Sequence, residues 1–139
     1  MTDTKHLHLR PARTDDSAAL IAILHSTFQS TWRPAITPAA AEAYAREHRP
    51  ADYVARCGLE FRVAERAGEV IGLVHWRDDF IHGLHVHSGH ARSGAGTALM
   101  DLAEAEIARA GFPAARLETD TFNTASQAFY AARGYVEAG

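Results

Sequence analysis

The sequence predicts an α/β fold whose elements follow the order β-α-α-β-β-β-α-β-α. Residues 80–87 are mostly apolar, aromatic and histidine residues between turn formers, which is typical of a short strand. From Thr97 onward the apolar residues recur at helical spacing. Upstream, two strand-like segments, 60–65 and 70–76, flank Ala67-Gly68-Glu69, which is a hairpin signal.

The first third of the chain predicts a strand and a helix. Residues 7–12 alternate enough for a first strand that ends near Pro11. The Thr-Asp-Asp run at 14–16 offers capping side chains for a helix that runs to about Phe28. Residues 29–36 contain a tryptophan and a proline, and we expect them to be irregular.

The remaining elements have local signals of their own. Thr37-Pro38 is a helix start, with Thr as the cap and Pro in the first turn, and it leads an alanine-rich helix to about His48. A short helical turn is expected around residues 53–56, and a turn at 77–79 leads into the strand 80–87. The last strand is expected at 115–120, before a C-terminal helix.

The glycine-marked loop between strand 80–87 and the following helix predicts an anion site. Backbone N–H groups at a helix start bind anions, and the missing side chains of Gly94 and Gly96 let a phosphate approach. A dinucleotide-binding fingerprint would need a third glycine at Leu99, and a Walker loop would need a lysine at Ala95. Neither of these patterns matches.

Two motifs do match a known family. Arg92-x-Gly94-x-Gly96 matches the core of the pyrophosphate loop of the GCN5-related N-acetyltransferase (GNAT) superfamily, although Ala91 stands where that family has Gln or Arg. Asn123-x-x-Ser126-x-x-Phe129-Tyr130-x-x-x-Gly134-Tyr135 matches the closing pattern of the family, with Ser for Ala as the one exception. The chain resembles this superfamily from about Leu7 to its C-terminus.

The resemblance implies a mixed sheet in which strands 80–87 and 115–120 splay apart at a bulge. Acetyl-coenzyme A lies in this notch, with its pantetheine arm paired to the first strand and its pyrophosphate at the glycine loop. The implied cofactor-binding residues are Leu84, His85, Val86, Arg92, Ser93, Gly94, Ala95, Gly96, Thr97, Asn123 and Tyr130.

The implied reaction moves an acetyl group from acetyl-coenzyme A to a primary amine of a small molecule or peptide by direct attack. Tyr130 occupies the family position of the acid that protonates the leaving thiolate. Because the side chains of Phe129 and Tyr130 point different ways on a helix, one can belong to the core while the other is functional.

The base that takes the amine proton has several candidates. Five of the nine histidines lie within residues 75–90, and histidine titrates near neutral pH. Strand alternation places His82 with Phe80 and Leu84, and His85 on the other face, unless a bulge resets it. We rank His82 first and His85 second, followed by Glu118 and Asp120, while some family members rely on water alone.

The acceptor side is implied by the family to involve the segment between the first two helices. Here this segment implicates Phe28, Trp32, Arg33 and Tyr44. Trp32 could equally fill the core beside Pro34. Aromatic groups there could line a pocket for an apolar or a cationic amine.

Composition narrows the function classes. A chain of 139 residues corresponds to one domain, and a net charge of −3 argues against nucleic-acid or anionic-membrane binding. The single cysteine, Cys57, excludes an internal disulfide and fits a reducing compartment. The first residues carry no apolar signal region, so we expect a cytoplasmic protein.

Two other interpretations stay open. His85-x-His87, with His90 nearby, could chelate a metal, but no third ligand stands at a recognised spacing and we expect no metal cofactor. Ala91 and Ser126 are departures that would suit a non-catalytic protein that binds acyl-coenzyme A.

The C-terminus carries one more expectation. Members of the family usually continue past the Gly-Tyr position with two further strands, and residues 135–139 would only begin the first of them. Strand 115–120 would then present an open edge. We expect either a further C-terminal segment or, as the alternative, a homodimer that covers this edge.

Overall fold

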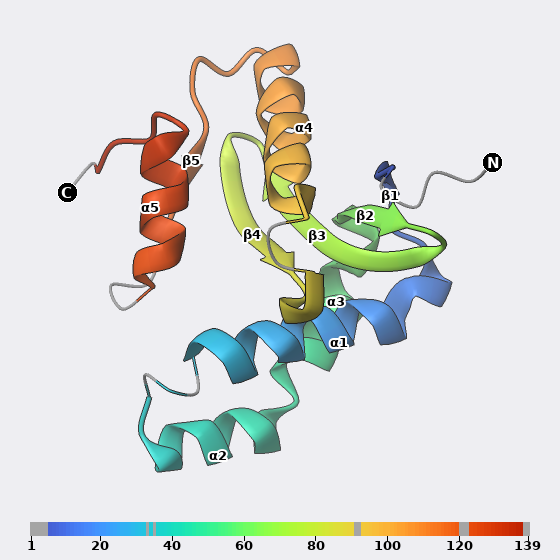
Figure 1. The fold of residues 1–139 in the computed structure, drawn as a ribbon, viewed down its shortest axis with the longest axis vertical. Helices are drawn as coiled ribbons and strands as arrows, with labels where there is room; N and C mark the ends of the chain where they lie inside the picture. Colours follow the sequence, from blue (N-terminus) through green and yellow to red (C-terminus); the bar gives the residue numbers. More distant parts are fainter. Residues whose placement is uncertain (1–5, 33, 35, 91–92, 120–122, 138–139) are drawn as a thin grey trace.

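Five strands form one sheet in the order β1-β2-β3-β4-β5 (Figure 1). The computed structural model describes residues 6–32, 34, 36–90, 93–119 and 123–137. Strands β1 to β4 pair antiparallel and β5 pairs parallel to β4, which confirms the mixed sheet. The strands are β1 (His8–Pro11), β2 (Arg62–Arg66), β3 (Glu69–Arg77), β4 (Phe80–Val86) and β5 (Arg116–Leu117).

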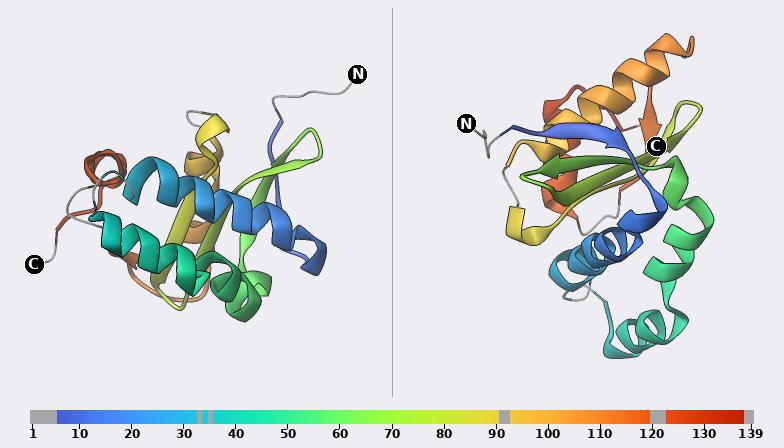
Figure 2. Two further views of the ribbon diagram at one scale, coloured as in Figure 1. Left: turned by 90° about the horizontal axis from the view of Figure 1, so that it is seen from below. Right: turned by 90° about the vertical axis from the view of Figure 1, so that its right-hand side faces the viewer.

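Helices lie on both faces of the sheet. Figure 2 shows α1, α2 and α3 on one side and α4 on the other, and α5 packs beside α4. The helices are α1 (Ser17–Thr27), α2 (Pro38–Glu47), α3 (Arg49–Cys57), α4 (Ala95–Arg109) and α5 (Thr124–Ala132).

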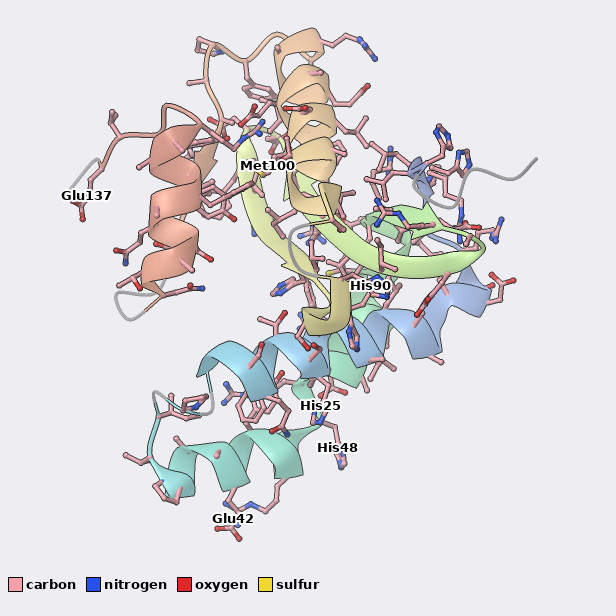
Figure 3. All side chains as sticks on the ribbon, in the orientation of Figure 1. His25, Glu42, His48, His90, Met100 and Glu137 are labelled. Atoms are coloured by element: carbon pink, nitrogen blue, oxygen red, sulfur yellow. The ribbon has the colours of Figure 1, made fainter. Side chains whose placement is uncertain are left out.

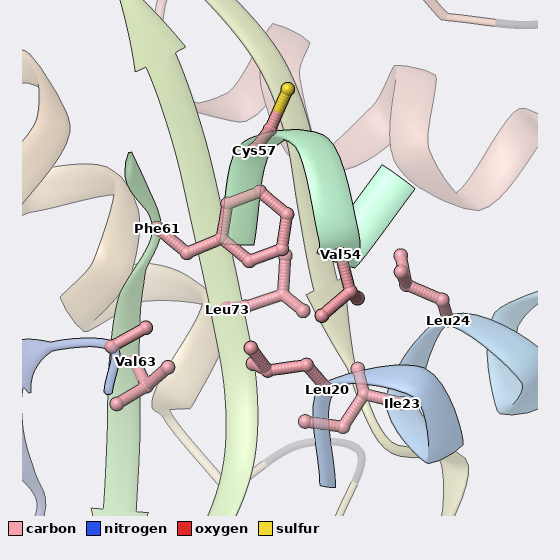
Figure 4. Packing of buried hydrophobic residues seen from close by; sticks show 9 residues of the cluster. Leu20, Ile23, Leu24, Val54, Cys57, Phe61, Val63 and Leu73 are labelled. Atoms are coloured by element: carbon pink, nitrogen blue, oxygen red, sulfur yellow. The ribbon is translucent and has the colours of Figure 1, made fainter. Parts of the chain in front are cut away.

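Two buried clusters join these layers. On the α4 face, Met100 points from the helix toward the strands, whereas Glu137 lies beyond α5 at the far end of the chain (Figure 3). The other cluster, between the sheet and helices α1 and α3, is drawn in Figure 4; its labelled side chains are Leu20, Ile23, Leu24, Val54, Cys57, Phe61, Val63 and Leu73.

Turn chemistry sets the two β-hairpins. Ala67 and Gly68 both have positive φ, 52° and 82°, which is the conformation of a tight turn that joins twisted antiparallel strands. This confirms the hairpin predicted from the sequence. Asp78, with φ 53°, reverses the chain between β3 and β4.

An ion-pair cluster ties β1 to the start of α1. Arg10 donates to both carboxylate oxygens of Asp16, at 2.8 and 3.0 Å, and to Glu65 on β2 at 2.7 Å. The backbone N–H of Arg13 also donates to Asp16, at 2.7 Å. These bonds lower the pKa of the buried Asp16 carboxyl, with the bond from Arg10 as the largest cause.

The helical boundaries correct three expectations. Residues 29–36 were expected to be irregular, but Phe28–Trp32 continue α1 as a π-helical turn. The turn expected at 53–56 belongs to the longer helix α3, whose Pro50, Val54 and Cys57 are buried on one face. The helix expected from Thr97 already begins at Ala95, directly after Gly94.

The last strand is also shorter than expected. Residues 115–120 were predicted to form it, but among the described residues only Arg116–Leu117 pair with β4. The strand is short because the chain separates from β4 after Leu117, and the backbone hydrogen bonds between the two strands end there. Asp120 lies outside the described residues.

Candidate active site

The loop before α4 has the geometry of an anion cradle. Gly94 caps the helix with a φ of 88°, a left-handed conformation that favours glycine. The first intrahelical bond runs from the Ala98 N–H to the Gly94 carbonyl at 3.0 Å. The N–H groups of Gly96 and Thr97 precede that bond, and such groups point along the axis toward an approaching anion.

Space around both glycines is open. A Cβ at Gly94 would have no heavy atom within 4 Å. A Cβ at Gly96 would make only ordinary contacts, 3.8 Å from Val86 and 3.9 Å from Phe129. Arg92 and Ala91, the other motif positions of this loop, lie outside the described residues.

Arg66 holds the loop from the neighbouring strand, and sequence reasoning missed it. Its Nη2 donates to the Ser93 carbonyl at 3.0 Å across 27 residues of chain. Ser93 Oγ in turn accepts from the Ala95 N–H at 3.3 Å. A pattern search finds no signal for Arg66, because hairpin-end arginines usually lie in solvent.

A cleft opens where β4 and β5 separate. The two strands pair only at Phe80 with Arg116 and Ile81 with Leu117, after which β4 continues to Val86. The cleft has a volume of about 880 Å³. Five predicted cofactor residues line it, namely Leu84, His85, Val86, Asn123 and Tyr130, whereas residues 93–97 lie outside its lining.

A β-bulge at His82 resets the alternation of β4. His75 pairs with Gly83 and Trp76 pairs with Ile81, so His82 is the extra residue. The ring of His82 therefore lies against Phe80 and His75, at 4.9 and 5.2 Å between centroids.

Because of this bulge, the β4 side chains lie on other faces of the sheet than simple alternation predicts. Leu84 was expected on the same face as His82, but it packs in the α4 cluster. His85 was expected on the other face from His82, but it points toward α1, where its Nδ1 lies 3.0 Å from Thr27 Oγ1 in a hydrogen bond. His82 and His85 therefore both leave the α4 face.

Tyr130 is half-buried at the cleft wall. Its ring makes edge contacts with Phe129 and Tyr135, at 5.3 and 5.7 Å between centroids. Phe129 and Tyr130 both pack against the α4 cluster, but only Tyr130 lines the cleft. Burial raises the pKa of the Tyr130 hydroxyl, while Arg133 partly opposes the shift, so the phenol is protonated at neutral pH.

The Gly134-Tyr135 motif holds the end of α5, which carries Tyr130, in place. Gly134 has a φ of 96°, and the N–H of Tyr135 returns to the Tyr130 carbonyl at 3.1 Å, which makes a Schellman cap on α5. The Tyr135 hydroxyl donates to Glu104 on α4 at 2.8 Å, and Arg133 donates to the same carboxylate. The motif thus anchors the end of α5 to α4.

Asn123 has a structural task in addition to its predicted one. Its Oδ1 accepts from the Ser126 N–H at 3.1 Å and caps α5. Asn123 and Ser126 both line the cleft, as does Glu118, the exposed third candidate for the base. Sequence reasoning identified Asn123 by its motif but not as this cap.

His85 is buried enough to change its chemistry. Burial lowers the pKa of its imidazole to about 4, so it is neutral at pH 7. His82 is exposed at the surface of the cleft. Of the two histidines predicted as bases, His82 is therefore the one whose ring is open to an incoming amine.

A hydrogen-bonded chain lies beside these histidines. The Tyr53 hydroxyl lies 2.6 Å from His75 Nδ1, and His75 Nε2 lies 3.2 Å from a Glu60 carboxylate oxygen. Arg77 forms a two-bond pair with Glu60, at 2.6 and 2.7 Å, and lowers the pKa of Glu60 to about 2. In the sequence, His75 stands out only as one of five clustered histidines, and Tyr53 carries no functional signal.

Burial sets the charge state of this chain. His75 is 2% exposed, and burial is the largest cause of its lowered pKa, against the opposing effect of Glu60. Burial also raises the pKa of the Tyr53 hydroxyl. At neutral pH Tyr53 is protonated, His75 is neutral and Glu60 is ionised.

Cys57, Glu60 and His75 lie close together, with one donor atom of each within 4.8 Å of the others. The Arg77 guanidinium supplies the positive charge at this place, because it donates to both Glu60 oxygens and, at 3.6 Å, to the Cys57 sulfur. His85 and His87, which suggested a chelate, bond elsewhere, to Thr27 and to the Gly89 N–H.

The residues predicted for the acceptor side do not all line the same cavity. Phe28 is 4% exposed, and its ring stacks on Tyr44 at 3.8 Å between centroids. Phe28 lines a second cavity, of about 680 Å³, between α1 and α2, and Tyr44 lines both cavities. Arg33 and the side chain of Trp32 lie outside what the structure describes.

Comparison with known families identifies this arrangement. A model of the acetyltransferase (GNAT) family matches residues 19–135, which include both motifs. The chain belongs to this family. The matched range of this GNAT chain contains the β4–β5 cleft, the glycine loop before α4 and Tyr130.

Solved structures confirm the GNAT fold. A GCN5-related N-acetyltransferase from Rhodopseudomonas palustris has a TM-score of 0.81 at 24% identity, over 100% of this chain and 86% of that one. The PaiA N-acetyltransferase from Thermoplasma acidophilum, solved with coenzyme A, has a TM-score of 0.79 at 19% identity, over 96% and 92% of the two chains. No curated protein matches the chain.

Within the described residues of this GNAT chain, no helix is both long and apolar enough to cross a membrane.

Proposed function

We propose that this chain transfers the acetyl group of acetyl-coenzyme A to a primary amine of a small molecule or peptide by direct attack. The observation that carries the proposal is the cleft between β4 and β5, which combines the predicted pantetheine strand with the half-buried phenol of Tyr130. A sheet that simply continued would pair these strands along their whole length.

The chain offers separate contacts for the two ends of the cofactor. The backbone of Leu84, His85 and Val86 lies along the cleft and would pair with the pantetheine amides. The N–H groups at the start of α4 would bind the pyrophosphate. Arg92 adds a positive charge to this loop in the sequence.

Tyr130 suits the role of the acid. When the amine attacks the thioester carbon, a C–N bond forms and the C–S bond breaks, and the departing thiolate needs a proton. The raised pKa of Tyr130 keeps the phenol protonated until that charge develops. Among the described residues its hydroxyl has no hydrogen-bond partner, so it can donate to the sulfur.

The amine must lose one proton as it attacks. His82 and His85 on β4 are the imidazoles that line the cleft, and either could take the proton directly or through water. Of these two, His82 is the more accessible, because it is exposed at the bulge while His85 has a pKa near 4 and is bonded to Thr27.

The acceptor would enter from the side of α3. The cleft lining combines aromatic and apolar groups with charges of both signs, such as Asp52, Arg56 and Glu118. These charges favour an amine that carries further polar groups. A purely apolar amine would remove water from the charged side chains without replacing the lost hydrogen bonds.

The test is a screen of primary amines with detection of the released thiol, together with Tyr130→Phe. We expect thiol release that depends on the amine, and in the variant a kcat lower by roughly 10²-fold or more with unchanged affinity for coenzyme A. Coenzyme A binding without turnover on any amine would instead indicate a non-catalytic acyl-coenzyme A binding protein. A melting temperature unmoved by cofactor would contradict the proposal altogether.

A further inference from the structure

We propose that the Tyr53 hydroxyl is the group that accepts the proton of the acceptor amine, with His75 and Glu60 behind it as the site that finally holds this proton. The proposal rests on the acetyltransferase function proposed above. Its geometry comes from three elements, namely α3, the short turn before β2, and β3.

Tyr53 reaches the cleft at the bulge of β4. It lines the same cleft as Tyr130, His82 and Gly83. A Cβ at Gly83 would lie 3.5 Å from the Tyr53 hydroxyl oxygen and 3.2 Å from His85 Nε2. The missing side chain of Gly83 therefore leaves the hydroxyl directly beside the strand on which the thioester would lie.

The carboxylate of Glu60 sets the direction of the hydrogen bonds. An ionised carboxylate can only accept, so His75 donates from Nε2–H at 3.2 Å. A neutral imidazole then accepts at Nδ1, and the Tyr53 O–H donates to it at 2.6 Å. The lone pairs of the Tyr53 oxygen are left to accept from an amine in the cleft.

The proton transfer balances without any further reactant. As the amine nitrogen bonds to the acetyl carbon, its N–H proton passes to the Tyr53 oxygen, and the Tyr53 proton passes to His75 Nδ1. The C–S bond breaks and the thiolate takes a proton from Tyr130. Solvent then receives the proton of His75 and restores that of Tyr130, so amine and thioester become amide and thiol.

Packing around the chain explains why His75 can hold a proton for a short time only. Its ring lies in an apolar site against Phe61, whose ring also contacts Tyr53; both centroid distances are 5.1 Å. Phe61 belongs to the cluster in Figure 4. Burial favours the neutral imidazole, whereas Glu60 favours the cation. The titratable and charged groups that face Tyr53 and His75 are Arg56, Cys57, Glu60, Arg77 and His82.

The arrangement differs from that of the two β4 histidines. His82 contacts His75 by its ring, at 5.2 Å, and His85 bonds to a threonine hydroxyl. Neither has a carboxylate partner among the described residues. Within the described part of the chain, His75 is the one of these three histidines that combines a hydroxyl on the cleft side with an ionised carboxylate on the other. This is the arrangement that positions a base and stabilises its cation.

The experiment compares Tyr53→Phe, His75→Gln and His82→Ala with wild type, using the best amine of the screen. Tyr53→Phe keeps the ring packing and removes only the hydroxyl. We expect kcat to fall by about 10²-fold in Tyr53→Phe and in His75→Gln, with little further loss in the double variant, because the two act as one unit. His8→Gln, on the exposed edge strand β1, is the matched histidine control.

Two readouts separate a catalytic from a merely structural role. Coenzyme A affinity should be unchanged in Tyr53→Phe, and the acidic limb of its kcat/KM profile, where His75 becomes protonated, should shift or disappear. Histidine NMR of the substrate-free chain should show His75 as the Nε2–H tautomer, with a pKa that changes in Tyr53→Phe.

The possible outcomes are distinguishable. A wild-type chain that acetylates no amine would overturn the proposed function and this role with it. Normal wild-type turnover with an unchanged kcat in Tyr53→Phe would overturn the role of Tyr53 alone. Loss of the acidic limb in His82→Ala but not in Tyr53→Phe would assign the base to His82. If the lower kcat of Tyr53→Phe came with a lower melting temperature that accounts for it, the network would be structural.

Discussion

Replacing Gly94 by alanine tests the anion cradle most directly. Gly94 has a φ of 88°, and a non-glycine residue in the left-handed region costs about 1–2 kcal/mol. A Cβ there would meet no heavy atom within 4 Å, so the backbone is the only source of this cost in the cofactor-free chain. For a chain of this length we expect the melting temperature to fall by about 3–8 °C.

The effect on cofactor binding should be larger than the effect on stability. A ligand at a hundred times its Kd stabilises the wild-type fold by about 2.7 kcal/mol, which raises its melting temperature by on the order of 10 °C. In Gly94→Ala the new methyl group stands on the open face where the pyrophosphate would approach. We expect most of this rise to disappear.

The control is Gly111→Ala at the other end of the same helix. Gly111 has a φ of 100° and equally open surroundings. It follows the 15-residue helix α4, whose length is about 22 Å. Scanning fluorimetry with and without coenzyme A should show similar loss of stability in both variants but a full cofactor shift only in Gly111→Ala. A wild-type shift in Gly94→Ala would refute the cradle.

Two further predictions concern the loop and the acid stability of the fold. Arg66→Met removes the bond to the Ser93 carbonyl and keeps the aliphatic stem, so calorimetry should show coenzyme A affinity lower by about 3- to 10-fold, unlike Arg62→Met on the same strand. Asp16→Asn should cost about 2 kcal/mol at pH 7, measured by urea unfolding. Because the folded pKa of Asp16 is lowered, its contribution is complete above the unfolded pKa of about 4 and is lost as pH falls through the folded value. The difference between wild type and Asp16→Asn should therefore shrink in acid, and a difference independent of pH would contradict the ion-pair explanation.

Much of this molecule was predictable because the features concerned depend on residues that are close together in the sequence. The Ala67-Gly68 hairpin, the glycine cap of α4 and the Asn123 to Tyr135 motif each depend on residues close in sequence. Their physical meaning is local, since positive φ, helix caps and helical periodicity involve one or two turns of chain.

The first and last residues of helices and strands were harder to predict, because neighbouring residues there favour different conformations. Helix α4 begins at Ala95 because Gly94 absorbs the reversal of the chain, although alanine and glycine give no apolar period there. His48 adopts a left-handed conformation, φ 50°, and separates α2 from α3 without the glycine that usually signals such a break. Strand β5 ends after two residues because its neighbour turns away, which is a property of the sheet.

The sequence by itself therefore determined the glycine loop before α4, the place of Tyr130 on the last helix, and the order of the elements apart from helix α3. Each of these follows from residues within a few positions of one another. Only the tertiary structure decided which histidine connects a tyrosine hydroxyl to a carboxylate. Tyr53, Glu60 and His75 come from a helix, a turn and a strand, and they meet because α3 packs on the face of the sheet to which the β4 bulge also turns His82. Such a meeting depends on packing and register, which no local pattern in the chain encodes.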